Sequence, residues 1–160
     1  MAMIMVNIAQ LRIARPPDVL CALGLGSCVG VVLYDPQTHI CGMLHVLLPV
    51  SRESGDDGQR PTKFANPGLL TLRDEVIRAG AQRSRLRAKL AGGAAVLIST
   101  SASGLAVVKQ NCEECLSVLA RMNIPVEGQD LGGTSGRTVY FEPENNLMRV
   151  KKLIGGERQL

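Results

Sequence analysis

Aromatic side chains are scarce in this sequence. Phe, Trp and Tyr together make up 2% of its 160 residues, and there is no tryptophan. Proteins that hold nucleic acid commonly stack the bases on aromatic rings, so we do not expect a nucleic-acid partner, although the formal net charge is +4. A basic excess suits an acidic partner surface instead. Much of it lies in residues 83–89, where basic residues recur at every second position, as on the solvated face of a strand.

Long apolar runs are missing as well. The N-terminus offers only residues 1–6, with no basic residue before them and no small-residue cleavage site after a long apolar core. Signal peptides and membrane-spanning helices need longer apolar segments. We therefore expect a cytoplasmic protein without membrane insertion. The five cysteines are an odd set in a chain of this length, which favours reduced thiols over a disulfide framework.

Metal-ligating patterns are weak in this chain. It has only two histidines, and the pair Cys112 and Cys115 has zinc-like spacing but no second pair and no histidine nearby. The glycine-rich residues 132–137 lack the lysine of a phosphate-binding loop and lead into a predicted strand. We therefore expect no metal and no cofactor. A hydrophobic content of 46% is enough for one core, so we expect one domain over residues 1–160.

Periodic apolar segments separated by turn residues predict a mixed α/β fold with two main helices. The predicted helices cover residues 67–78, with Asn66 as the cap, and 104–122. The predicted strands are residues 3–8 or onward to 13, 19–24, 29–34, 41–48, 86–98 as one strand or a pair, 138–142 and 147–152. Residues 51–61 are polar and predict a mobile loop that could rim a site.

One cysteine differs from the others by its position. Cys28 closes a loop that contains Gly24 and Gly26, where the backbone can bend sharply and a substrate can come close. His45 follows seventeen residues later, on the second strand of a predicted hairpin. A thiol and an imidazole are a candidate nucleophile and base. The alternatives are a cysteine packed in the core and a structural histidine on a core-facing strand.

Two segments around these residues resemble the signature of the chemoreceptor glutamine deamidases, the CheD family. They are residues 23–36, LGLGSCVGVVLYDP, and residues 42–49, GMLHVLLP. The similarity continues in the same order through residues 63–65, 89–94, Asn111 and residues 130–137. The resemblance implies an α/β sandwich with mixed or antiparallel sheets, similar to glutamine-deamidating toxins. It also implies an enzyme that converts selected glutamines of methyl-accepting chemotaxis receptors to glutamate, regulated by a CheC-type phosphatase.

The resemblance assigns roles to individual residues. It makes Cys28 the nucleophile and His45 the base, and we expect the two to form an ion pair that lowers the pKa of the thiol. The loop at Gly26 and Ser27, with the Cys28 amide, is the candidate oxyanion site. The family has a catalytic threonine where this chain has Ala22. We therefore expect the main-chain carbonyl of Ala22 to orient the imidazole.

Two other functions fit the same residues. Because the threonine hydroxyl is missing, one alternative is a protein that regulates the phosphatase or the receptor by binding, with little or no catalysis. A thiol with a base can also attack esters, so a hydrolase of receptor methyl esters is a further alternative.

Overall fold

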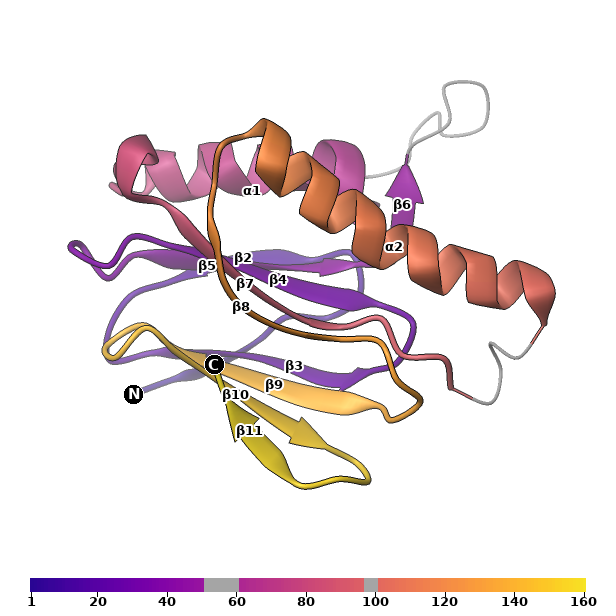
Figure 1. The fold of residues 1–160 in the computed structure, drawn as a ribbon. Coiled ribbons are helices and arrows are strands. Elements are labelled where there is room, and N and C mark those ends of the chain that lie inside the picture. Colours follow the sequence, from indigo (N-terminus) through magenta and orange to yellow (C-terminus); the bar gives the residue numbers. More distant parts are fainter. Residues whose placement is uncertain (51–60, 97–100) are drawn as a thin grey trace.

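Ten of the strands in the described part of the chain form two five-stranded sheets (Figure 1). The computed structural model describes residues 1–50, 61–96 and 101–160. The first sheet has the order β1 (Met3–Met5), β3 (Val19–Leu25), β9 (Arg137–Glu142), β10 (Leu147–Lys152), β11 (Glu157–Gln159). The second has the order β2 (Leu11–Ala14), β5 (Cys41–Val46), β4 (Val29–Tyr34), β7 (Arg87–Gly92), β8 (Val126–Leu131). Each sheet is mixed, since β1 runs parallel to β3 and β7 parallel to β8.

The remaining elements flank the second sheet. They are β6 (Leu48–Val50), the short 3-10 helices η1 (Pro61–Lys63) and η2 (Arg83–Arg85), and the helices α1 (Ala65–Arg78) and α2 (Ala102–Arg121). Both α-helices cover one face of the second sheet, and the first sheet covers its other face (Figure 1). The molecule therefore has three layers. No helix in the described ranges is long and apolar enough to cross a membrane.

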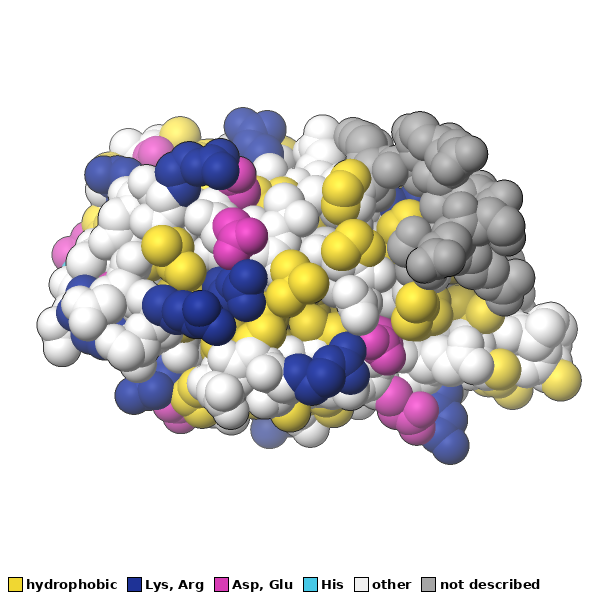
Figure 2. Space-filling model, turned by 90° about the horizontal axis from the view of Figure 1, so that it is seen from above, with side chains coloured by type: hydrophobic (Ala, Val, Ile, Leu, Met, Phe, Trp, Pro, Cys, Tyr) yellow, Lys and Arg dark blue, Asp and Glu magenta, His cyan; other side chains and the backbone are white. Residues whose placement is uncertain are grey.

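Two apolar cores follow from these layers. One lies between the helices and the second sheet and includes Leu69, Leu72 and Leu119. The other joins the two sheets and includes Leu20, Met43 and Phe141. The outer face of the helix layer carries acidic and basic side chains near one another, with hydrophobic side chains between them (Figure 2). The described part of this face therefore offers no continuous basic surface.

The sequence predicted the fold class and most of the elements. The hairpins β4–β5 and β9–β10 are present, with both strands of each close to their predicted bounds. Helix α2 begins two residues earlier than predicted, after Ser101, whose hydroxyl accepts a hydrogen bond from the Gly104 amide at 3.1 Å. Helix α1 is assigned from Ala65, but Asn66 has the extended dihedral angles of a residue at a helix N-cap, so the regular part of the helix begins after it, as predicted.

Two predicted strands have different extents in the structure. The segment up to residue 13 is divided between β1 and β2, which belong to different sheets. The chain turns at Ala9, where φ is 62°, and the Gln10 amide bonds back to the Asn7 carbonyl. The strand predicted at residues 86–98 ends at Gly92, where φ is 119°. Residues 97–98 and the predicted loop, apart from Pro61, lie outside the described residues.

The predicted solvated strand face at residues 83–89 is wrong. Arg83–Arg85 form a 3-10 turn, and only the later part of the segment is strand. Lys89 is buried and donates hydrogen bonds to the Asn146 and Leu160 carbonyls at 2.6 and 2.8 Å. Alternation alone could not distinguish these partners from solvent, because they come from segments far away in the sequence.

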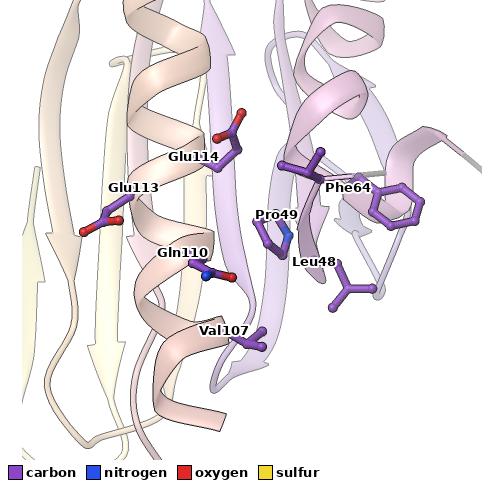
Figure 3. A pocket seen from close by; sticks show the side chains of 8 residues that line it. Leu48, Pro49, Phe64, Val107, Gln110, Glu113 and Glu114 are labelled. Carbon is purple, nitrogen blue, oxygen red and sulfur yellow. The ribbon is translucent and has the colours of Figure 1, made fainter. Parts of the chain in front are cut away.

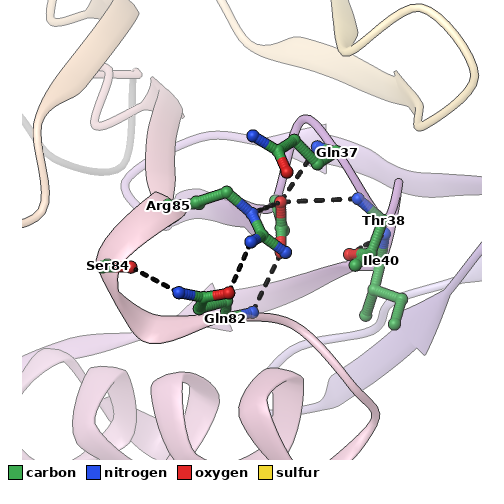
Figure 4. A network of polar contacts seen from close by, with 7 residues as sticks. Gln37, Thr38, Ile40, Gln82, Ser84 and Arg85 are labelled. Atoms are coloured by element: carbon green, nitrogen blue, oxygen red, sulfur yellow. Dashed lines mark hydrogen bonds and ion pairs between the residues drawn. The ribbon is translucent and has the colours of Figure 1, made fainter.

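Arg85 takes part in a buried network around Asp35 (Figure 4). Its guanidinium donates to both carboxylate oxygens of Asp35, at 2.9 and 2.8 Å. The main-chain amides of Gln37, Thr38 and Gln82 donate to the same carboxylate. Burial by itself would raise the pKa of Asp35, but these hydrogen bonds hold it well below its usual range. The network ties the β4–β5 turn to the segment that leads into β7.

Replacing Asp35 with alanine should lower the free energy of unfolding by about 3 kcal/mol at neutral pH, because several donors lose a buried acceptor at once. A carboxyl with a lowered folded-state pKa stabilises the protein above its unfolded-state pKa of about 3.9 and stops doing so as the pH falls through the folded value. The difference from wild type in urea unfolding should therefore shrink below about pH 4. Asp74→Ala is the control, since Asp74 is exposed and pairs with its neighbour Arg73. A cost at Asp35 no larger than at Asp74 would contradict this account.

Candidate active site

The predicted nucleophile lies where the chain passes from one sheet to the other. β3 belongs to the first sheet and β4 to the second, and Gly26, Ser27 and Cys28 connect them. The pairing of β3 with β9 is irregular just before this loop, and Gly24 has a φ of 62°, a conformation that favours glycine. The glycine spacing therefore bends the end of β3 and places Cys28 at the junction of the two sheets.

Three successive carbonyl groups of this loop accept hydrogen bonds from the second sheet and its helix layer. The Gly26 carbonyl accepts from the Ala94 amide at 2.8 Å, and the Cys28 carbonyl accepts from the Gly93 amide at 2.9 Å. The Ser27 carbonyl between them accepts from the side-chain amide of Asn111 at 3.1 Å. All three donors lie at the end of β7 or on α2. The loop is therefore fixed to the second sheet and its helix layer.

The amide groups of the loop point the other way. In a trans peptide the N–H is directed opposite to the preceding carbonyl, so the N–H groups of Ser27 and Cys28 face away from those donors. Neither makes a hydrogen bond with another residue that the structure describes. Two unpaired main-chain donors beside a thiol have the arrangement of an oxyanion site. The Ser27 hydroxyl likewise has no partner among the described residues, so the structure gives it no structural role.

Cys28 and Ser27 line an open cavity of about 660 Å³ between the first sheet and the nucleophile loop. Cys28 is only 7% exposed, but its place in the lining shows that the residue is reached from this cavity. The rim is apolar at Leu23 and Leu153. The basic residues of the lining are Arg137, Lys151 and Lys152. Residues 83–89 do not line this cavity.

A buried ion pair supports the wall behind the loop. Arg137 and Asp130 are 3% and 5% exposed, and their side chains approach to 3.2 Å. Arg137 also donates to the Gly92 carbonyl at 2.9 Å. A Cβ atom on Gly92 would collide with the Cys28 carbonyl oxygen, and its φ of 119° already disfavours other residues. The end of β7 can therefore approach the nucleophile loop only because glycine occupies this position.

His45 faces the same inter-sheet layer as Cys28. It pairs directly with Gly30 across β4 and β5, and Cys28 precedes Gly30 by two residues. If the register is continued by one residue beyond Val29, Cys28 is a diagonal neighbour of His45 on one face, a relation in which residues of a regular ladder are about 7–8 Å apart and their Cβ atoms somewhat closer. Met43 and Leu47, the alternate residues of this strand, pack in the inter-sheet core, as predicted from sequence.

The group that orients His45 is not the predicted one. Its Nδ1 atom lies 3.0 Å from the carbonyl oxygen of Val6, in the segment after β1. A carbonyl can only accept, so Nδ1 carries the proton and Nε2 keeps a free lone pair, the tautomer that a general base needs. The Ala22 carbonyl was predicted for this role, but Ala22 is fully buried in the inter-sheet core and the imidazole bonds to Val6 instead.

The surroundings of both groups affect their charges. Burial raises the pKa of the Cys28 thiol above its ordinary value. Burial lowers the pKa of His45, an effect that the hydrogen bond to Val6 only partly opposes. Burial in this layer therefore works against the expected ion pair, and the charges must form as substrate reacts.

A second cavity of about 630 Å³ lies between α2 and β6 (Figure 3). Its lining combines apolar residues such as Phe64 and Val107 with Glu113 and Glu114, and it contains neither a thiol nor an imidazole. Across the described ranges no cluster of three or more His, Cys, Asp or Glu side chains is placed to hold a metal ion. The cavity at Cys28 is therefore the better candidate for chemistry.

Asn111, Val6 and the basic rim of this cavity were not predicted as parts of the site. The sequence carries no signal for Val6 or for Lys151 and Lys152, because their roles arise from a neighbouring sheet. Asn111 had two signals: it belongs to the resemblance to the CheD family, and it is a polar residue at a buried position of an amphipathic helix.

The fold and the site together define an α/β protein with a candidate thiol-dependent hydrolytic site. The sequence profile of a family described as CheD chemotactic sensory transduction matches residues 47–152. This chain belongs to the CheD family.

Full-length relatives extend the match across the candidate site. The probable chemoreceptor glutamine deamidase CheD of Oceanobacillus iheyensis is 39% identical over 149 residues, 92% of this chain and 90% of the relative. The chemoreceptor glutamine deamidase CheD of Bacillus subtilis is 38% identical over 158 residues, 98% of this chain and 95% of the relative. The probable chemoreceptor glutamine deamidase CheD of Pyrococcus abyssi is 36% identical over 154 residues, 96% of this chain and 94% of the relative.

Proposed function

We propose that this protein hydrolyses the side-chain amides of selected glutamines in chemotaxis receptors, converting them to glutamate, with Cys28 as the nucleophile. Membership in the CheD family and the names of its relatives support the activity and the substrate. The observation that carries the assignment of the site is Cys28 itself, in the lining of an open cavity and next to two unpaired main-chain donors.

The first step is attack on the carboxamide carbon. Nε2 of His45 accepts the thiol proton as the sulfur forms its bond to carbon, so the raised thiol pKa is overcome only when substrate is in place. The carbonyl π electrons move onto oxygen. The N–H groups of Ser27 and Cys28 stabilise that oxyanion, and one such donor is typically worth about two to three orders of magnitude in rate.

The second step expels ammonia. The imidazolium returns its proton to the departing nitrogen as the carbon–nitrogen bond breaks, and a thioester remains on Cys28. Water then attacks the thioester carbon and gives a proton to Nε2 of His45, which passes it to the leaving sulfur. The products are a glutamate side chain and the free thiol. The carbonyl of Val6 accepts from Nδ1 throughout, so that Nε2 is the nitrogen that gains and loses the proton.

The rim of the cavity suits a flat, partly acidic helical surface. Leu23 and Leu153 are 56% and 86% exposed, and Lys151 and Lys152 stand beside them. We propose that this rim contacts the receptor in the cytoplasm. A CheC-type phosphatase is the proposed regulatory partner, and the exposed apolar rim gives it a surface on which to compete with the receptor.

Incubation with a receptor cytoplasmic domain, followed by peptide mass spectrometry and an ammonia assay, tests the function. Specific glutamines should become glutamate, with one ammonia released for each conversion. A matched receptor carrying glutamate methyl esters tests the ester-hydrolase alternative. Methanol release with unchanged glutamines would replace the proposed function by that alternative.

Ala22 bears on the alternative of a binding regulator with weak catalysis. Because His45 is already held by Val6, Ala22→Thr should leave the deamidation rate unchanged or lower it, since extra atoms must enter a packed core. Ala22→Val, which matches threonine in shape without the hydroxyl, separates packing from hydrogen bonding. A rate increase of orders of magnitude in Ala22→Thr but not in Ala22→Val would identify this chain as a weakened enzyme.

A further inference from the structure

The side chain of Asn111 connects the two segments that carry the proposed catalytic pair. Its Nδ2 atom donates to the Ser27 carbonyl at 3.1 Å and to the Leu47 carbonyl at 2.9 Å. Ser27 precedes the nucleophile, and Leu47 follows the base by two residues. Asn111 lies on α2, on the opposite side of the second sheet from the inter-sheet core. One amide group therefore fixes the nucleophile loop and the residue that follows β5 relative to each other.

The orientation of this amide follows from its neighbours. Both contacts are carbonyl oxygens, which only accept, so the NH2 end of Asn111 must face them. The other end of the amide, Oδ1, is buried and has no hydrogen-bond partner among the described residues. A buried acceptor without a partner costs stability. Stability alone therefore explains poorly why asparagine occupies this position. The two hydrogen bonds that its Nδ2 donates are the contacts that it contributes.

We infer that Asn111 is a positioning residue that aims the oxyanion donor of Cys28. The Ser27 carbonyl and the Cys28 N–H belong to one rigid peptide plane. Of the three loop carbonyls, this one alone depends on a side chain, since main-chain amides hold those of Gly26 and Cys28. The hydrogen bond from Asn111 fixes the rotation of the plane and polarises the N–H on its far side. The inference rests on the proposed function and adds to it a residue outside the cavity lining.

Substitution should affect the transition state more than substrate binding. Asn111→Leu removes both donors at similar volume, and Asn111→Asp puts a carboxylate against two carbonyl oxygens. Each should lower kcat about 100-fold, the effect of losing one oxyanion donor, with little change in KM for a receptor cytoplasmic domain. The alkylation rate of Cys28 by iodoacetamide across pH should stay as in wild type. Gln110→Leu, a change of the neighbouring amide on the same helix, is the control and should leave kcat unchanged.

A measurement on the wild-type protein does not depend on how well the variants fold. Propionaldehyde matches the end of a glutamine side chain, with hydrogen in place of the amide nitrogen. The Cys28 sulfur can bond to its carbonyl carbon while the thiol proton moves to Nε2 of His45 and the π electrons move onto oxygen, so that a tetrahedral carbon presents its oxygen to the proposed donors. Hydrogen exchange of the Cys28 N–H should become slower in this adduct, and the adduct should form less tightly in Asn111→Leu.

Three results would overturn the inference. The first is unchanged kcat in both Asn111 variants. The second is a loss of kcat matched by an equal change in Cys28 alkylation, which indicates a general distortion of the loop. The third is unaltered exchange of the Cys28 N–H in the adduct. Absence of receptor deamidation by the wild-type enzyme would count against the proposed function instead, because the exchange measurement requires no turnover.

Discussion

Replacing Cys28 with alanine should abolish receptor deamidation, with a fall in rate of about four orders of magnitude or more. In this mechanism the carbon–nitrogen bond of the amide breaks only after the sulfur has bonded to the carboxamide carbon. Loss of the nucleophile in a comparable thiol or hydroxyl mechanism has effects of about this size or larger. The rate of conversion of receptor glutamines to glutamate is measured by peptide mass spectrometry. Receptor binding should persist, since the apolar and basic rim of the cavity is intact.

Cys112→Ala is the matched control for this experiment. Cys112 is the one half-buried cysteine among five, and the other three outside the loop are buried. It is therefore the most accessible rival thiol. Deamidation should continue in Cys112→Ala and stop in Cys28→Ala. Cooperative unfolding transitions should show that both variants are folded. Equal activity of Cys28→Ala and wild type would show that the chemistry takes place elsewhere.

Replacing His45 with alanine should lower the rate of deamidation by about two to four orders of magnitude, the range for loss of a general base. The pH dependence should change with it. Because burial lowers the pKa of His45, the imidazole of the wild type stays neutral at pH values below its ordinary pKa of about 6.5. Wild-type activity should therefore be level through neutral pH and fall only on the acidic side of that value.

In His45→Ala this acidic fall should disappear. The remaining activity should instead increase at alkaline pH, above the ordinary thiol pKa of about 8.5, because burial raises the pKa of Cys28 and no base assists its ionisation. His39 provides the control, since it lies in the β4–β5 turn and bonds to the Pro143 carbonyl. His39→Ala should keep both the rate and the acidic limb. An acidic limb that survives in His45→Ala would assign it to another group.

The sequence predicted the local elements well, because local patterns determine them. The glycine-spaced loop at Cys28 and the hairpin that carries His45 on a core-facing position are examples. The resemblance to the CheD family also came from contiguous residues. These features require only neighbours in the chain, whose periodicity and turn residues are visible in the printed sequence.

The partners of those residues could not be predicted, since they come from other layers. Val6 reaches His45 across 39 positions, and Asn111 reaches Ser27 across 84. The effect of burial on the charges of Cys28 and His45 could not be predicted for the same reason. Burial in the inter-sheet layer disfavours both charges, and burial depends on which sheet covers the site.

Trapping with hydroxylamine is the most direct test of the central claim that a thioester forms on Cys28. Hydroxylamine added during deamidation should intercept the intermediate, and the modified receptor position should carry a hydroxamate in place of part of the glutamate. The product should require Cys28 and should be absent from the Cys28→Ala variant. Normal conversion of receptor glutamines to glutamate with no hydroxamate in the wild-type reaction would contradict the mechanism.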